Sequence, residues 1–213
     1  PSFLRPDTRS EEQVSEADRP VIGALALQGD FAAHSAAMER LGADVRPVRK
    51  IAQLEGLDGL IIPGGESTTL IRLMDVFDFW DPLKAWIQAG PPVLGTCAGA
   101  ILLASEVLSP EQKCFGLIDI TVERNSYGRQ VDSFEGYGTF RPVVQQEVEI
   151  EMVFIRAPRI IRVGDGVEIL GDCRSDTVVA RQGNVVVSTF HPELGAGSDI
   201  HSYFLQMVEA ARS

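Results

Sequence analysis

The stretch VIGALALQGDFAAHSAAMERLGADVRPV, residues 21–48, carries the pattern from which the fold can be predicted. It opens with a continuous apolar run of strand length, which is typical of a strand buried on both faces. Asp30 is placed to cap the helix that follows, and Gly42 to end it. The next segment, 44–50, predicts a strand near a sheet edge, because Pro47 cannot donate to a ladder.

The same alternation of strand and helix continues through the first half of the chain. It predicts strands at 58–63 and 91–96. Helices are predicted after GGESTT (64–69) as far as Phe79, at 81–90 and at 98–105. The second half is richer in strands, predicted at 116–124, 133–143, 151–157, 167–172, 177–182 and 184–190, before a helix at 198–212. We therefore expect a single α/β domain at 21–213, a three-layer sandwich with a mostly parallel central sheet flanked by helices. The polar segment 1–20 is expected to be a disordered leader.

Composition excludes several classes of protein. The formal charge is −11, from 30 acidic and 19 basic residues, and such a surface repels phosphate backbones, so no nucleic-acid partner is expected. No apolar run approaches the ~20 residues that cross a bilayer, and the start of the chain lacks the features of a signal peptide. A cytoplasmic protein without a membrane partner is expected. Three widely spaced cysteines argue against a disulfide framework and a zinc site.

Cys97 is the candidate nucleophile. Gly95-Thr96-Cys97-Ala98-Gly99 has the form G-x-nucleophile-x-G, placed between an apolar strand and a helix, where a sharp turn projects the central side chain above the sheet. N–H groups at the start of that helix favour a thiolate. The alternative is a small buried cysteine beside a glycine pair, and that is the interpretation we favour for Cys114 and Cys173, which lack this context.

His191 is the candidate base. Residues two apart in extended chain point the same way, so Glu193 can orient the His191 ring across Pro192. The alternative for His-Pro-Glu is a surface turn. The other two histidines, His34 and His201, lie in predicted helices and are expected to be packing, surface or interface residues.

A glycine-rich turn after the third strand is the candidate anion site. In Gly64-Gly65-Glu66-Ser67, adjacent glycines allow backbone N–H groups to approach a ligand, although an ordinary turn would look the same. We expect the Gly65 and Ala98 N–H groups to form an oxyanion hole.

Taken together, GTCAG (95–99), FHPE (190–193) and PGGES (63–67) resemble the class I, triad-type glutamine amidotransferases. Within that family, GGESTT (64–69), ERNSYGRQVDSFE (123–135) and FIRAP (154–158) closely resemble the glutaminase subunits of pyridoxal 5′-phosphate synthases, the vitamin B6 branch. The resemblance runs from about Ile22 to the final helix and implies the family's flavodoxin-like fold.

By this resemblance the chain hydrolyses L-glutamine to L-glutamate and ammonia, with Cys97 as nucleophile, His191 as base and acid, and Glu193 as the orienting residue. The implied glutamine-binding residues are Gly64, Gly65, Glu66, Ser67, Arg124, Ile155 and Arg156. A guanidinium fork matches the carboxylate of an amino acid, although surface salt bridges are the alternative for both arginines.

The resemblance also implies a partner, a synthase subunit that receives the ammonia within a hetero-oligomeric ring assembly. No step needs a metal or an organic cofactor. Gln28-Gly29-Asp30 and the helix that carries His34 are the candidate interface. Three alternatives remain open: a glutaminase serving a histidine or nucleotide pathway, a non-catalytic regulatory module, and a cysteine peptidase on a similar fold.

Overall fold

The computed structural model describes residues 18–124, 133–143 and 146–213. Most of the expected leader, and most of the ERNSYGRQVDSFE run, therefore lie outside the described residues. From Asp18 onward the chain is bound to the domain, since Arg212 donates to the Asp18 carbonyl (3.0 Å) and the Asp44 N–H to the Pro20 carbonyl (2.9 Å).

Among the described residues, the central sheet has nine strands in the order β2-β1-β3-β4-β12-β11-β10-β7-β8. The first five run parallel: β2 (Asp44–Val48), β1 (Val21–Leu25), β3 (Gly59–Ile62), β4 (Val93–Thr96) and β12 (Val185–Ser188). This is the flavodoxin-like order, and it confirms the expected fold class. The Pro47 strand lies at the edge, as predicted.

The other four strands of this sheet attach antiparallel, so the sheet is mixed and the prediction of a mostly parallel sheet holds only for its first five strands. They are β11 (Asp176–Gln182), β10 (Glu168–Cys173), β7 (Ser133–Val143) and β8 (Gln146–Ile155). Short connections between strands allow hairpins, whereas parallel neighbours need long crossovers.

A smaller sheet contains β5 (Ala104–Leu108), β6 (Ile118–Glu123) and β9 (Arg159–Val163). Two of its strands differ from the prediction. The helix expected at 98–105 ends at Leu103, because Ala104 starts β5 and pairs with Ile118. The β9 strand was missed, since its pairing partner β6 is distant in sequence.

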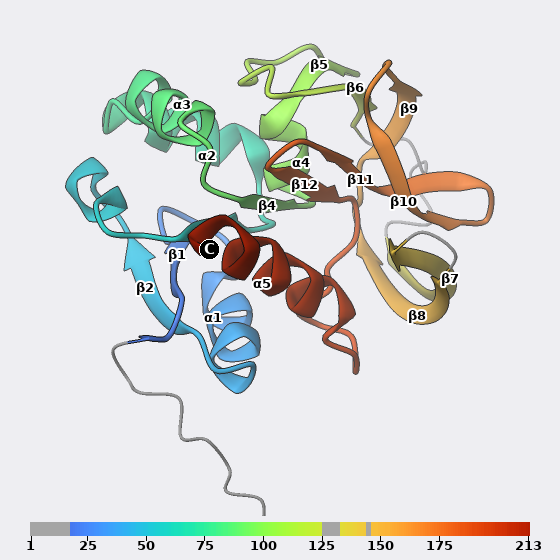
Figure 1. The fold of residues 1–213 in the computed structure, drawn as a ribbon. Helices are drawn as coiled ribbons and strands as arrows, with labels where there is room; N and C mark the ends of the chain where they lie inside the picture. The colour runs from blue at the N-terminus through green and yellow to red at the C-terminus, as the bar shows by residue number, and fades with distance from the viewer. Residues whose placement is uncertain (1–17, 125–132, 144–145) are drawn as a thin grey trace, which may run out of the picture.

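Helices cover both faces of the central sheet (Figure 1). On one face lie α1 (Phe31–Arg40) and α5 (Asp199–Arg212), and on the other α2 (Ser67–Val76), α3 (Trp80–Gln88) and α4 (Ala98–Leu103); a 3₁₀ turn, η2, spans Ile51–Leu54. None of the described helices is long and apolar enough to span a membrane.

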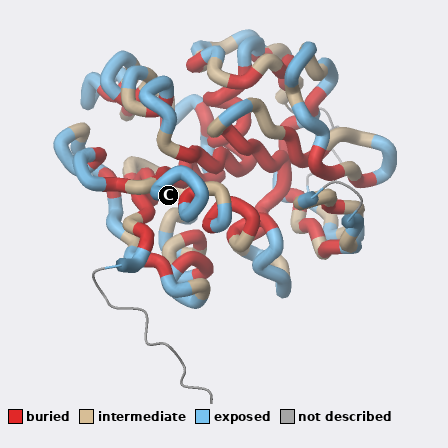
Figure 2. Tube along the Cα trace, viewed as in Figure 1, coloured by how far each residue is buried: buried red, intermediate tan, exposed pale blue. Residues whose placement is uncertain are grey.

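Two hydrophobic cores follow from this layering. Leu60 and Ile62 of β3 pack in the core beneath α2, α3 and α4, whereas Ile61 between them packs in the core with α1 and α5. Successive side chains of a strand point to opposite faces, so an uninterrupted apolar strand supplies both cores. Figure 2 shows the resulting buried band through the centre of the molecule.

Candidate active site

Three loops meet at one end of the sheet because β3, β4 and β12 are neighbours. Ile62 pairs with Gly95, and Ser188 with Thr96, so these parallel strands end side by side. The loops that follow them carry the glycine turn, Cys97 and His191, and the carboxyl ends of parallel strands are where sites of such folds lie.

Cys97 stands at the turn between β4 and α4. Its backbone has φ 48° and ψ −103°, which is a conformation that residues other than glycine rarely adopt. The Cys97 N–H donates to the carbonyl of Ser188 (2.8 Å), which ties the turn to the neighbouring strand β12. The surrounding sheet therefore holds this strained backbone in place.

The glycines on either side of Cys97 are required by packing. A Cβ at Gly95 would lie 2.5 Å from the Leu103 side chain and 2.8 Å from the Gly99 backbone. A Cβ at Gly99 would overlap the carbonyl oxygen of Ile62. The helix start thus lies directly against β3, and the motif reflects that close approach.

His191 and Glu193 lie in contact across Pro192, as expected from their spacing. Nδ1 of His191 lies 2.8 Å from Oε1 of Glu193. The backbone N–H of His191 donates to the Val153 carbonyl (2.8 Å), so strand β8 fixes the backbone of this loop. The Glu193 side chain is completely buried.

The environment of His191 favours the imidazolium. Burial lowers its pKa, but hydrogen bonds and charge attraction from Cys97 and then from Glu193 outweigh burial and raise the pKa to about 10. Cys97 thus faces a positively charged ring at neutral pH, which is the arrangement that stabilises a thiolate.

The Gly64-Gly65 turn lies against this pair. A Cβ at Gly64 would lie 2.6 Å from Cε1 of His191 and 3.3 Å from Cβ of Cys97. Gly65 has φ 141°, and a Cβ there would overlap the Gln28 amide. Gln28, which the sequence placed on the active-site side as an interface candidate, thus packs against the turn.

A pocket of about 210 Å³ opens beside Cys97. It is lined by Gly65, Glu66, Ser67, Cys97, Ile101, Arg124, Ile155, Arg156, Pro158 and His191. Six of the seven expected glutamine-binding residues are in this set; the seventh, Gly64, lies against Cys97 and His191. Ala98, the other oxyanion candidate, is the buried first residue of α4. Sequence reasoning missed Ile101 and Pro158, since apolar residues in a pocket wall look like core residues.

The two arginines of the pocket lie in different settings. Nη2 of Arg124 lies 3.6 Å from Oε1 of Glu66, and the Arg124 side chain is only 12% exposed. Arg156 follows β8 with φ 45°, and the preceding carbonyl, of Ile155, lies 4.0 Å from the Cys97 sulfur. Strained backbone beside a nucleophile is characteristic of functional sites.

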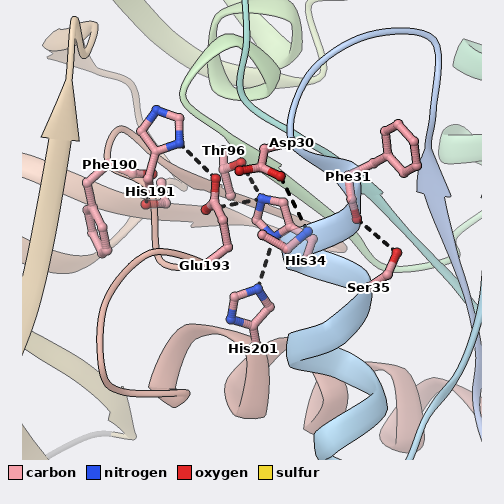
Figure 3. Close-up of polar contacts among 11 residues, drawn as sticks. Asp30, Phe31, His34, Ser35, Thr96, Phe190, His191, Glu193 and His201 are labelled. Atoms are coloured by element: carbon pink, nitrogen blue, oxygen red, sulfur yellow. Dashed lines mark hydrogen bonds and ion pairs between the residues drawn. The ribbon is translucent and has the colours of Figure 1, made fainter.

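The remaining cysteines and histidines lie away from the pocket. Cys114 and Cys173 are free thiols like Cys97, half-buried and buried respectively. His34 and His201 are both buried, so neither side chain lies at the surface of the chain. Both lie on the far side of Glu193 from His191 (Figure 3).

Comparison with known proteins gives close relatives over nearly the whole chain. The chain is 49% identical over 188 residues to the pyridoxal 5′-phosphate synthase subunit PdxT of Thermosipho africanus, covering 88% of this chain and 98% of the relative. It is 50% identical over 192 residues to PdxT of Corynebacterium jeikeium, covering 89% and 97%.

Comparison with solved structures gives a glutamine amidotransferase as well. A crystal structure of a glutamine amidotransferase superposes with a TM-score of 0.82 at 44% identity, covering 88% of this chain and 98% of that one. The structure of PurLQS from Thermotoga maritima shares the fold alone, with a TM-score of 0.62 at 17% identity over 91% of this chain and 96% of that one. Residues 24–210 match the SNO glutamine amidotransferase family, and the chain belongs to it.

Proposed function

We propose that this chain is the glutaminase subunit of a pyridoxal 5′-phosphate synthase, in which Cys97, His191 and Glu193 act as a catalytic triad. The observation that carries the proposal is that Cys97 and His191, which meet at the Gly64 turn, line one pocket together with Arg124 and Arg156. The relatives that are named as subunits of that synthase are 49% and 50% identical to this chain, and they support its assignment to vitamin B6 synthesis.

The proposed chemistry is acyl transfer to sulfur. The Cys97 thiolate attacks the carboxamide carbon of glutamine, and the N–H groups of Gly65 and Ala98 stabilise the oxyanion. The His191 imidazolium gives its proton to the departing ammonia and leaves a glutamyl thioester. A water that His191 deprotonates then hydrolyses the thioester and releases glutamate. Glu193 keeps the ring oriented and stabilises its positive charge.

The rest of the pocket offers complementary charges to the amino acid end of glutamine. The guanidinium groups of Arg124 and Arg156 suit the α-carboxylate. The Glu66 carboxylate, at the pocket wall beside Arg124, suits the α-ammonium group. Gly64, Ser67 and Ile155 complete the binding surface.

Ammonia released into water at neutral pH is mostly protonated, and ammonium is not a nucleophile. We therefore propose that residues 21–213 act as one glutaminase domain that passes ammonia through a closed path to a synthase subunit, in a ring-shaped hetero-oligomer in the cytoplasm. The Gln28–Gly29 loop packs against the Gly64-Gly65 turn, so a partner bound at this loop would contact the segment that carries the proposed oxyanion donor.

Glutamate release from glutamine, measured with and without the cognate pyridoxal 5′-phosphate synthase subunit, tests the proposal. We expect release that increases when that subunit is present and that disappears in Cys97→Ala, whereas Cys114→Ala, which changes a free thiol outside the pocket, retains it. Release that increases only with a synthase of histidine or nucleotide synthesis would contradict the assignment to vitamin B6. Release that survives Cys97→Ala would contradict the mechanism.

A further inference from the structure

Two buried histidines lie behind the Glu193 carboxylate, and the proposed chemistry uses neither. His34 comes from α1 and His201 from α5, and they are 0% and 1% exposed. Figure 3 shows His34 between Thr96, Glu193 and His201. Buried histidines that fill space do not need this alignment with a buried carboxylate.

The contacts form a continuous line. Nε2 of His34 lies 3.0 Å from Oγ1 of Thr96 and 3.2 Å from Oε2 of Glu193. Its Nδ1 lies 2.9 Å from Nε2 of His201. One ring therefore connects the residue before the nucleophile with the residue that orients the base.

The partners of His34 determine where its proton lies. A carboxylate only accepts hydrogen bonds, so the Nε2 atom that faces Glu193 carries the proton, and Nδ1 accepts from the His201 Nε2–H. Nδ1 of His201 is then a bare acceptor, and it has no hydrogen-bond partner among the described residues. The opposite tautomers would bury a His201 N–H without an acceptor and direct a His34 lone pair at the carboxylate, and both are unfavourable.

Both rings are neutral at physiological pH. Burial, the neighbouring His201 and the charge of His191 hold the pKa of His34 well below its ordinary value. Burial, and then Arg40, lower the pKa of His201 to about 4. A neutral donor therefore faces Glu193, which leaves the carboxylate charge available to His191.

Glu193 needs such a donor. Its side chain is fully buried, and Oε1 is the atom that contacts His191. Oε2 makes no hydrogen bond within the described part of the chain. The donor that faces it is the His34 Nε2–H, 3.2 Å away, which also lies 3.0 Å from Oγ1 of Thr96. An uncompensated buried carboxylate oxygen is costly and would favour rotation or protonation of the group.

We propose that His34 is a positioning residue, whose Nε2–H holds the Glu193 carboxylate so that Oε1 faces His191, and that His201 fixes the tautomer of His34. The proposal deepens the proposed function, since it rests on Glu193 as the residue that orients the base. His34 lies outside the pocket and acts only through Glu193.

Two amide substitutions separate positioning from packing. The amide nitrogen of His34→Gln reaches about as far as Nε2 and can still donate to Glu193, whereas that of His34→Asn reaches only the Nδ1 position, which faces His201. We expect His34→Asn to lower kcat about 10- to 100-fold, as for a lost hydrogen bond to a charged group, with KM for glutamine unchanged. The pKa of His191 should fall from about 10, and His34→Gln should restore both. Met38→Ala, which opens a cavity one turn along the same buried helix face, is the control for lost stability.

Wild-type kcat in His34→Asn would overturn the proposal. Equal losses in the Asn and Gln variants that follow melting temperature, as in Met38→Ala, would also overturn it. Nitrogen NMR of the wild-type protein is independent of how the variants fold: we expect His34 protonated on Nε2, and a proton on Nδ1 would contradict the account. The tautomer and the His191 titration need no substrate, so they remain informative if wild type fails to hydrolyse glutamine, the result that would instead refute the proposed function.

Discussion

Replacing Gly99 with alanine probes the packing that shapes the turn at Cys97. The new Cβ would overlap the Ile62 carbonyl oxygen and lie 3.2 Å from the Ile62 Cγ2. The obstacle is backbone in the fully buried strand β3, so no flexible side chain can move aside. Overpacking of this kind costs about 1–3 kcal/mol, and a backbone obstacle places the cost near the upper value.

Such a cost predicts a measurable loss of stability. At about 3 kcal/mol, a domain of this size should lose about 6–12 °C in melting temperature. Relief of the overlap must push α4 away from β3, and both elements adjoin groups to which we assign a role in the reaction, since α4 follows Cys97 and β3 leads to Gly64. A displacement of about 1 Å can lower the rate about 100-fold.

The assays are thermal unfolding and glutamate release with the synthase present. Gly136→Ala is the matched control, because the nearest atom to its Cβ would be 3.7 Å away in an antiparallel hairpin. We expect its stability to stay within about 0.5 kcal/mol of wild type. If Gly99→Ala melts with wild type and hydrolyses glutamine at the wild-type rate, the packing argument for the turn is wrong.

Two further substitutions test the charges of the site. Glu193→Gln keeps an acceptor beside Nδ1 of His191 but removes the negative charge. The pKa of His191 should therefore fall from about 10, and NMR titration should show the ring losing its proton at lower pH. An unchanged titration would contradict the claim that the Glu193 charge raises the pKa of His191. Arg124→Lys removes the guanidinium fork from the pocket and should raise KM for glutamine about tenfold or more, with a smaller change in kcat. The control is Arg46→Lys, an exposed position at the sheet edge, which should change neither constant. An unchanged KM in Arg124→Lys would exclude this arginine as a substrate contact.

The parallel half of the fold could be predicted because its signals are local. The apolar run at Val21, the Asp30 cap and the Gly42 stop all lie within one strand–helix unit, and Asp30 does accept from the Ala33 N–H (3.4 Å). The sequence signals for the turn at Cys97 and for the contact of His191 with Glu193 were equally local, since each is carried by residues no more than two positions away.

What the sequence could not supply depends on distant pairing. The end of α4 at Leu103 follows from the pairing of Ala104 with Ile118, and no signal near Leu103 reports it. The line from Glu193 to His34 and His201 joins three segments that only the folded sheet brings together. A histidine among alanines looks like a packing residue, and its polar partners lie far along the chain.

The sulfur of Cys97 is the group on which the proposed reaction depends, and its reactivity can be measured directly. A chloroketone analogue of glutamine would carry an alkylating carbon into the pocket, and peptide mass spectrometry would identify which of the three cysteines it labels. We predict rapid labelling of Cys97 alone, slowed by glutamine and nearly abolished in His191→Ala. Labelling of Cys114, the more exposed thiol, at the same rate and without protection by glutamine, would contradict the account.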